Sequence, residues 1–123
     1  MRRKYERDCG IDLELTESGT VGPHEWAIFM LEEVDLRDSE YQALLIPRHS
    51  TFAMGLLIST SLIDSGFCGR PQLQVYNMTN ERKIVRKHDY LCQMLFIPRI
   101  VPDGVETEMG ARKNEAENNS SRP

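Results

Sequence analysis

The stretch that decides the fold is PRHSTFAMGLLISTSLIDSGFCGRPQLQVYN, residues 47–77. It contains two short apolar runs, MGLLIST at 54–60 and QLQVYN at 72–77, which have the length and side-chain alternation of β-strands. Between them, residues 62–69 carry Asp64, Ser65 and two glycines, a composition typical of tight turns. This region therefore predicts a turn or hairpin tip that could present a side chain to a ligand.

The same strand periodicity continues on both sides of this stretch. Further strands are predicted at residues 11–15, 25–34, 41–47, 83–87 and 90–98, and no long helix is indicated. Seven short strands separated by turn residues are typical of a sandwich or barrel. The sequence thus predicts an all-β fold.

The 123 residues suffice for one hydrophobic core. We predict one domain over residues 1–102 and a polar, flexible tail over 103–123, which contains no Phe, Tyr, Trp, Ile or Leu. The net charge of −4 offers no general attraction to nucleic acid or to an anionic membrane. The positive N-terminus lacks the apolar segment of a signal peptide, and no run is long enough to span a membrane, so we expect an intracellular protein.

The three cysteines, Cys9, Cys68 and Cys92, are widely spaced and form no CxxC pair. An odd number without a nearby histidine in ligand register indicates neither a disulfide framework nor a zinc site. We expect buried free thiols.

Four segments resemble, in order and spacing, the motifs of the dUTPase and dCTP deaminase superfamily. CGIDLEL (9–15) is similar to AGxDL, PRHSTFAMGL (47–56) to PRSSxxxxGL, SLIDSGFCG (61–69) to GxIDxxYxG, and HDYLCQMLF (88–96) to GDRIAQLxF, with Asn77 at the expected distance. The resemblance implies a dUTPase-like jelly roll or β-barrel of the β-clip type that forms a homotrimer. It also implies hydrolysis of dUTP to dUMP and pyrophosphate, with Mg²⁺ bound through the substrate triphosphate.

The third motif supplies the candidate catalytic residue. Asp64 matches the aspartate that orients and deprotonates the attacking water, a task suited to a carboxylate on a hairpin. From residue type alone, a turn-capping role for Asp64 is favoured, and the flanking motif makes the role of base an equal alternative. Phe67 matches the tyrosine that lies against the deoxyribose, although a core aromatic beneath the hairpin is an equal alternative. The backbone from Ser61 to Ile63 is expected to read the base.

The first, second and fourth motifs imply a phosphate site at a subunit boundary. Arg48 and Asp12 match residues that lie near one another there. A buried pair of this kind would need both members, because removing one leaves the other without a partner. A purely structural role for the pair is the alternative. Gln93 matches the glutamine that reaches the phosphates, although a strand glutamine bonded to its neighbours is equally common.

Departures from the motifs leave a second hypothesis open. His49 stands in place of the first PRSS serine and could donate to phosphate or block the pocket, while Ser50, if on a strand, would point to the opposite face. Ser61 replaces a glycine, and the glycine-rich fifth motif has no recognisable counterpart. The alternative is a catalytically impaired protein of this fold that binds a nucleotide or a protein partner. Deamination is not expected, because Gln74 replaces the catalytic glutamate of the deaminases and cannot shuttle protons.

Overall fold

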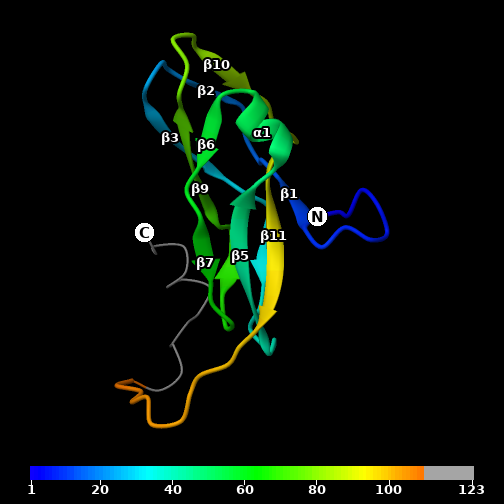
Figure 1. The fold of residues 1–123 in the computed structure, drawn as a ribbon, viewed down its shortest axis with the longest axis vertical. Coiled ribbons are helices and arrows are strands. Elements are labelled where there is room, and N and C mark those ends of the chain that lie inside the picture. The colour runs from blue at the N-terminus through cyan, green and yellow to red at the C-terminus, as the bar shows by residue number, and fades with distance from the viewer. Residues whose placement is uncertain (110–123) are drawn as a thin grey trace.

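The computed structural model describes residues 1–109, and these form strands with a single short helix, α1 (Figure 1). The elements are β1 (Ile11–Glu14), β2 (Gly19–Val21), β3 (Trp26–Met30), β4 (Val34–Asp35), β5 (Tyr41–Pro47), α1 (His49–Ala53), β6 (Leu56–Ile58), β7 (Ser61–Ile63), β8 (Cys68–Gly69), β9 (Gln72–Asn77), β10 (Lys83–Val85) and β11 (Tyr90–Pro98). The all-β prediction is confirmed. No helix within 1–109 has the length and apolarity needed to cross a membrane.

Two antiparallel sheets form the framework. The larger has the strand order β1-β11-β5-β7, and the smaller has the order β3-β9-β6. The pairs β10-β2 and β4-β8 complete the described strands. The first and last strands of the domain, β1 and β11, lie side by side and pair with each other although they are distant in sequence. This pairing brings the first and fourth motifs together.

Side-chain alternation along β5 and β11 divides the large sheet into a core face and an outer face. Ala43 and Leu45 are buried, while Leu44 and Ile46, which alternate with them, are half-buried. Met94, which pairs with Leu45, is fully buried as well. Because successive side chains of a strand point to opposite faces, the outer face carries the even-numbered residues of β5.

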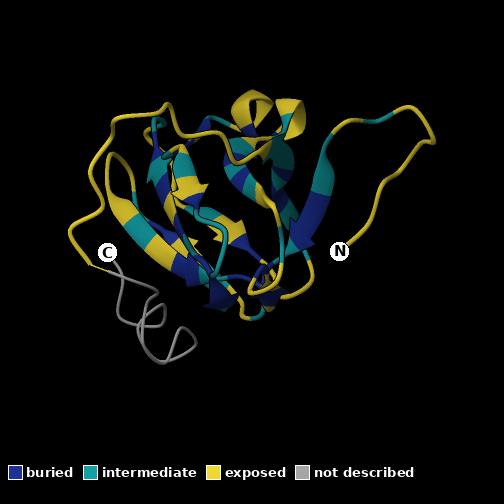
Figure 2. Cartoon of the chain, turned by 90° about the horizontal axis from the view of Figure 1, so that it is seen from below, coloured by how far each residue is buried: buried dark blue, intermediate teal, exposed yellow. Residues whose placement is uncertain are grey.

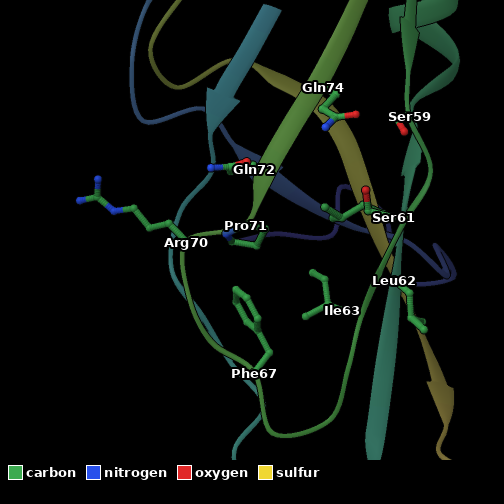
Figure 3. A pocket seen from close by; sticks show the side chains of 10 residues that line it. Ser59, Ser61, Leu62, Ile63, Phe67, Arg70, Pro71, Gln72 and Gln74 are labelled. Atoms are coloured by element: carbon green, nitrogen blue, oxygen red, sulfur yellow. The ribbon is translucent and has the colours of Figure 1, made fainter. Parts of the chain in front are cut away.

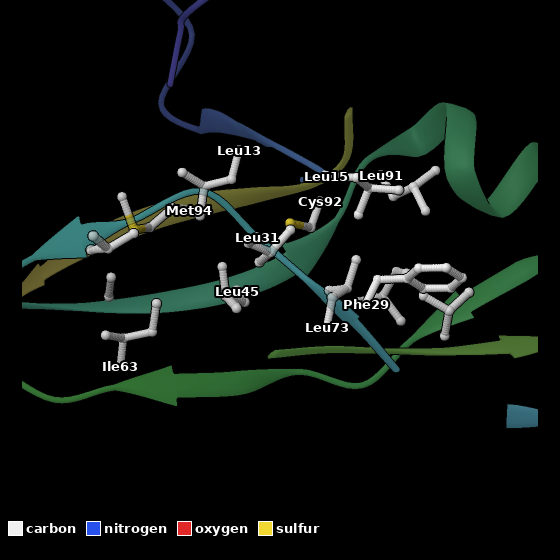
Figure 4. Packing of buried hydrophobic residues seen from close by; sticks show 14 of the residues in the cluster. Leu13, Leu15, Phe29, Leu31, Leu45, Ile63, Leu73, Leu91, Cys92 and Met94 are labelled. Atoms are coloured by element: carbon white, nitrogen blue, oxygen red, sulfur yellow. The ribbon is translucent and has the colours of Figure 1, made fainter. Parts of the chain in front are cut away.

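The core lies between the sheets (Figures 2 and 4). It is built almost wholly from aliphatic side chains, chiefly Leu13, Leu15, Leu31, Leu45, Leu56, Leu73, Val75, Val85 and Met94. Burial of a Leu or Val side chain contributes about 1.5–3 kcal/mol relative to exposure. The described chain leaves no buried side-chain nitrogen or oxygen without a hydrogen-bond partner.

The helix α1 was not predicted, and it corrects the expected position of Ser50. Residues 49–53 turn into a helix after β5, and the buried Thr51 hydroxyl donates to the Leu91 carbonyl at 2.6 Å. Gly55 follows with φ +83°, a left-handed conformation that favours glycine after a helix end. Ser50 is therefore an exposed helix residue.

Other boundaries also differ from the sequence expectations. The predicted strand at 25–34 is two strands, β3 and β4, and the short β2 was missed. Residues 62–69 include part of β7 and all of β8 as well as a turn. Cys68 and Cys92 are buried free thiols as expected, but Cys9 is exposed, which corrects that expectation. Residues 99–109 are exposed without regular structure, and 110–123 of the predicted tail lie outside the described residues.

Candidate functional site

The candidate site residues fall into two cavities. The inner cavity, of about 320 Å³, lies between β7 and β9 and is shown in Figure 3. Its lining combines an apolar part, made by Leu45, Leu62, Ile63, Phe67 and Pro71, with polar side chains from Ser59, Ser61, Arg70, Gln72 and Gln74. The outer cavity, of about 540 Å³, is lined by Lys4, Tyr5, Asp8, Cys9, Gly10, Asp12, Ile46, Arg48, His49, Gln93 and Leu95.

A tight turn shapes one end of the inner cavity. The Phe67 amide donates to the Asp64 carbonyl at 3.1 Å, and Gly66 takes a φ of +97°, which a glycine adopts without steric cost. The turn is fastened to the connection between β4 and β5, because the Gly66 amide donates to the Leu36 carbonyl and the Leu36 amide to the Phe67 carbonyl. The turn is therefore restrained by backbone hydrogen bonds to another part of the chain.

Asp64 and Phe67 occupy opposite ends of this turn. The Phe67 ring is 5% exposed and belongs to the core, yet it also lines the inner cavity, so the two sequence interpretations of this residue are compatible. Asp64 is half-buried and is not among the lining residues, although its neighbour Ile63 is. Ser61 is half-buried and lines the cavity (Figure 3).

An ion pair organises the outer cavity. Arg48 Nε lies 3.2 Å from Asp12 Oδ1, and Arg48 Nη1 donates to the Tyr90 carbonyl at 3.1 Å. Arg2 Nε lies 3.3 Å from the other Asp12 oxygen, and the Asp12 side chain is only 8% exposed. A nearly buried carboxylate needs such partners, because an unpaired charge there would be strongly destabilising.

Gln93 lies beside this ion pair because of strand register. It pairs with Asp12 on β1 and with Ile46 on β5, so the three form one row across the outer face. Its Nε2 donates to the Pro47 carbonyl at 3.2 Å. A Cβ added at Gly10 would overlap the amide end of the Gln93 side chain, so a larger residue there would displace that side chain.

His49 and Ser50 separate at the start of α1. His49 is exposed and lines the outer cavity, whereas Ser50 lines neither cavity. Lys4, Tyr5 and Asp8 line the outer cavity but were not predicted as site residues; the signal for them in the sequence is the basic character of residues 1–7. Arg70 and Gln72 line the inner cavity and were not predicted either.

The two cavities lie on opposite faces of the large sheet. Leu45 lines the inner cavity and the adjacent Ile46 lines the outer one. Consecutive strand residues point to opposite faces, so β5 separates the two linings at this point. The structure thus brings together Asp12, Arg48, His49 and Gln93, and separately Ser61, Ile63 and Phe67.

Comparison with known proteins gives the family of the chain. The family model described as dUTPase matches residues 1–121. No curated protein sequence matches the chain. Among solved structures, a mutant dUTPase from phage phi11 of S. aureus, described for its coordination of a structural Mg(II) ion, aligns with a TM-score of 0.76 and 19% identity over 90% of both chains.

Two further dUTPase structures are similar. That of Streptococcus mutans has a TM-score of 0.73 and 20% identity, covering 84% of this chain and 88% of its own. A mutant dUTPase of Staphylococcus bacteriophage 80alpha, solved with dUpNHpp, has a TM-score of 0.72 and 20% identity, covering 93% of this chain and 84% of its own. At these identities the structures show a shared fold, and the family assignment rests on the family model. The chain belongs to the dUTPase family.

Proposed function

We propose that the chain hydrolyses dUTP to dUMP and pyrophosphate at sites shared between the subunits of a homotrimer. One observation carries the proposal: residues matching the nucleoside motif line one cavity, those matching the phosphate motifs line another, and the two lie on opposite faces of the sheet. A second copy that apposes its outer cavity to the inner cavity of the first would complete the site. Symmetric assembly repeats that contact in every subunit.

The inner cavity takes the nucleoside in this proposal. Phe67 gives the sugar an apolar surface that leaves no room for a ribose 2′-hydroxyl, and the backbone from Ser61 to Ile63 faces the base. Asp64, held at the start of the turn, orients and deprotonates the water that attacks the α-phosphorus. The turn's hydrogen bonds to Leu36 limit the motion of this carboxylate.

The outer cavity takes the phosphates. Arg48 and Gln93 are its donors, and Asp12 holds the Arg48 guanidinium in place while keeping part of it in reach of the cavity. Asp12 thus acts as a positioning residue. His49 lies on the same cavity, where a protonated imidazole would donate to a phosphate oxygen.

Mg²⁺ fits this arrangement as part of the substrate complex. Among residues 1–109, no group of three or more His, Cys, Asp or Glu side chains is placed to hold a metal ion. A hard cation that prefers oxygen ligands would therefore be carried by the triphosphate. When bound, it neutralises charge on the leaving pyrophosphate.

The test is pyrophosphate release by the purified chain with Mg²⁺ from dUTP, dCTP, dTTP, dATP, dGTP and UTP. We expect release from dUTP and discrimination against UTP and dCTP, which for a buried polar mismatch reaches about 10⁴-fold. Comparable hydrolysis of UTP would overturn the role of Phe67. Absence of release from every nucleotide would overturn the proposed activity.

A further inference from the structure

The first eight residues form an arm that folds back onto β1. The Arg2 amide donates to the Asp12 carbonyl at 3.0 Å and the Asp12 amide to the Arg2 carbonyl at 2.6 Å, an isolated antiparallel bridge. The Arg2 guanidinium lies 4.1 Å from the centroid of the Tyr90 ring and also pairs with Asp12. These contacts hold the arm beside the phosphate motifs.

A turn in the arm brings Lys4 to the outer cavity. The Tyr5 amide donates to Asp8 Oδ2 at 2.9 Å, and the Asp8 amide donates to the Tyr5 carbonyl at 3.1 Å. Lys4, Tyr5 and Asp8 consequently line the cavity together with Arg48 and Gln93. The arm therefore supplies part of the wall of the same cavity that we assign to phosphates.

The cavity wall carries two cations, Arg48 and Lys4, and they differ in their partners. Arg48 pairs with Asp12 Oδ1, while Arg2 pairs with the other oxygen of the same carboxylate. Asp8 is engaged with the Tyr5 amide. Lys4 forms no ion pair with any residue in 1–109, and its ammonium lies 5.5 Å from the Tyr5 ring centroid. A long, flexible side chain with three donors is suited to a mobile phosphate group.

We propose that Lys4 binds the triphosphate of the substrate in the outer cavity. This inference rests on the proposed function and extends it to a residue outside the motifs. A lysine delivered by the N-terminal arm would offset charge on the phosphates, in a chain whose sequence has no recognisable glycine-rich fifth motif. Lys4 contacts the ligand directly, whereas Arg2 holds the arm.

The experiment compares the full chain with Lys4→Gln, Lys4→Arg and Arg7→Gln. Arg7→Gln is the matched control, because Arg7 is in the same arm, carries the same charge, and neither lines the cavity nor forms an ion pair within 1–109. The first readout is calorimetric binding of inorganic triphosphate with Mg²⁺. The second is the KM and kcat for dUTP. Unfolding midpoints verify that each variant folds.

We expect Lys4→Gln to weaken triphosphate binding about tenfold and to raise KM for dUTP, while Lys4→Arg and Arg7→Gln stay near the unmutated protein. If Lys4→Gln and Arg7→Gln weakened triphosphate binding equally, the effect would come from the net charge of the arm and not from a contact with Lys4, which would overturn the inference. So would unchanged binding by Lys4→Gln, or no triphosphate binding by the unmutated chain. Lys4-dependent triphosphate binding without dUTP hydrolysis would instead reject the proposed function and leave the role of Lys4 standing.

Discussion

At the scale of single residues, Asp12 links the first, second and fourth motifs. Its carboxylate pairs with Arg48 after the end of β5 and with Arg2 in the N-terminal arm. Its position on β1 places it beside Gln93 on β11. The side chain is nearly buried and pairs with both arginines, so removing either partner would be destabilising. The residue holds Arg48 beside the outer cavity.

Asp64→Asn tests the proposed base. Asparagine keeps the size and turn-forming capacity of aspartate but removes the proton acceptor, so we expect kcat to fall by about 10²-fold or more. Binding of dUpNHpp should remain or tighten, because a carboxylate near a triphosphate repels it. Single-turnover hydrolysis and calorimetry measure the two effects. Equal rates in both proteins would leave Asp64 as a turn residue only.

The cysteines give a second prediction at this scale. Cys9 is exposed, whereas Cys68 and Cys92 are buried, and burial raises the pKa of the Cys92 thiol to about 12. Since the thiolate is the reactive form, we expect one thiol per chain to react with a disulfide reagent at pH 8 in the native protein, and all three in urea. Cys9→Ser should abolish the native reaction. A fast native reaction in that variant would contradict the burial of the other two.

At the scale of elements, the segment from β5 through α1 to β6 connects the cavities. Arg48 and His49 follow the end of β5 and line the outer cavity. The helix α1 then leads into β6, which pairs with β9. Thr51 fastens α1 to β11 through the Leu91 carbonyl. The position of His49 therefore depends on how this helix starts and ends.

Gly55→Ala tests the end of this helix. Its φ of +83° is unfavourable for alanine by about 1–2 kcal/mol, and the added Cβ would collide with Thr79. We expect the free energy of unfolding to fall by about 1–3 kcal/mol in urea titrations at equal protein concentration.

Gly104→Ala is the matched control, with a φ of +85° but no heavy atom within 4 Å of the added Cβ. It lies among the exposed residues 99–109, which have no regular structure and can relax, so we expect a change within about 0.5 kcal/mol. If the two variants lost stability equally, the contact with Thr79 would have no role.

At the scale of the whole molecule, the decisive feature is the placement of the cavities on opposite faces of one sheet. A site that needs both must be shared between copies of the chain. Light scattering should then give about three times the 14.2 kDa chain mass. A monomer at micromolar concentration would contradict the shared site.

Complementation tests the sharing itself. Asp64→Asn impairs the nucleoside half and Arg48→Gln the phosphate half, so each homotrimer should be inactive. In trimers assembled from equal amounts of both, random mixing leaves about a quarter of the sites with two intact halves. We expect about that fraction of the unmutated activity after refolding together. No recovery, with mixed trimers verified by mass, would place both halves within one subunit.

Much of the fold could be predicted from the sequence because its determinants are local. Apolar alternation in residues 41–47, 72–77 and 90–98 located β5, β9 and β11. A strand with one buried face places an apolar side chain at every second residue, because successive side chains point to opposite faces. The helix α1 could not be predicted from PRHSTFAMG, because its stability comes from the buried Thr51 contact with β11. Five residues are too few to form a helix by propensity alone.

The sequence by itself determined the dUTPase family through motifs whose residue types and order can be compared directly. Only the tertiary structure decided that Asp12 pairs with two arginines, that Lys4 lines the outer cavity, and that the two cavities face away from each other. These features depend on pairing between the first and last strands of the domain. Such pairing is set by packing of the whole core, because no short segment can bury its apolar face alone.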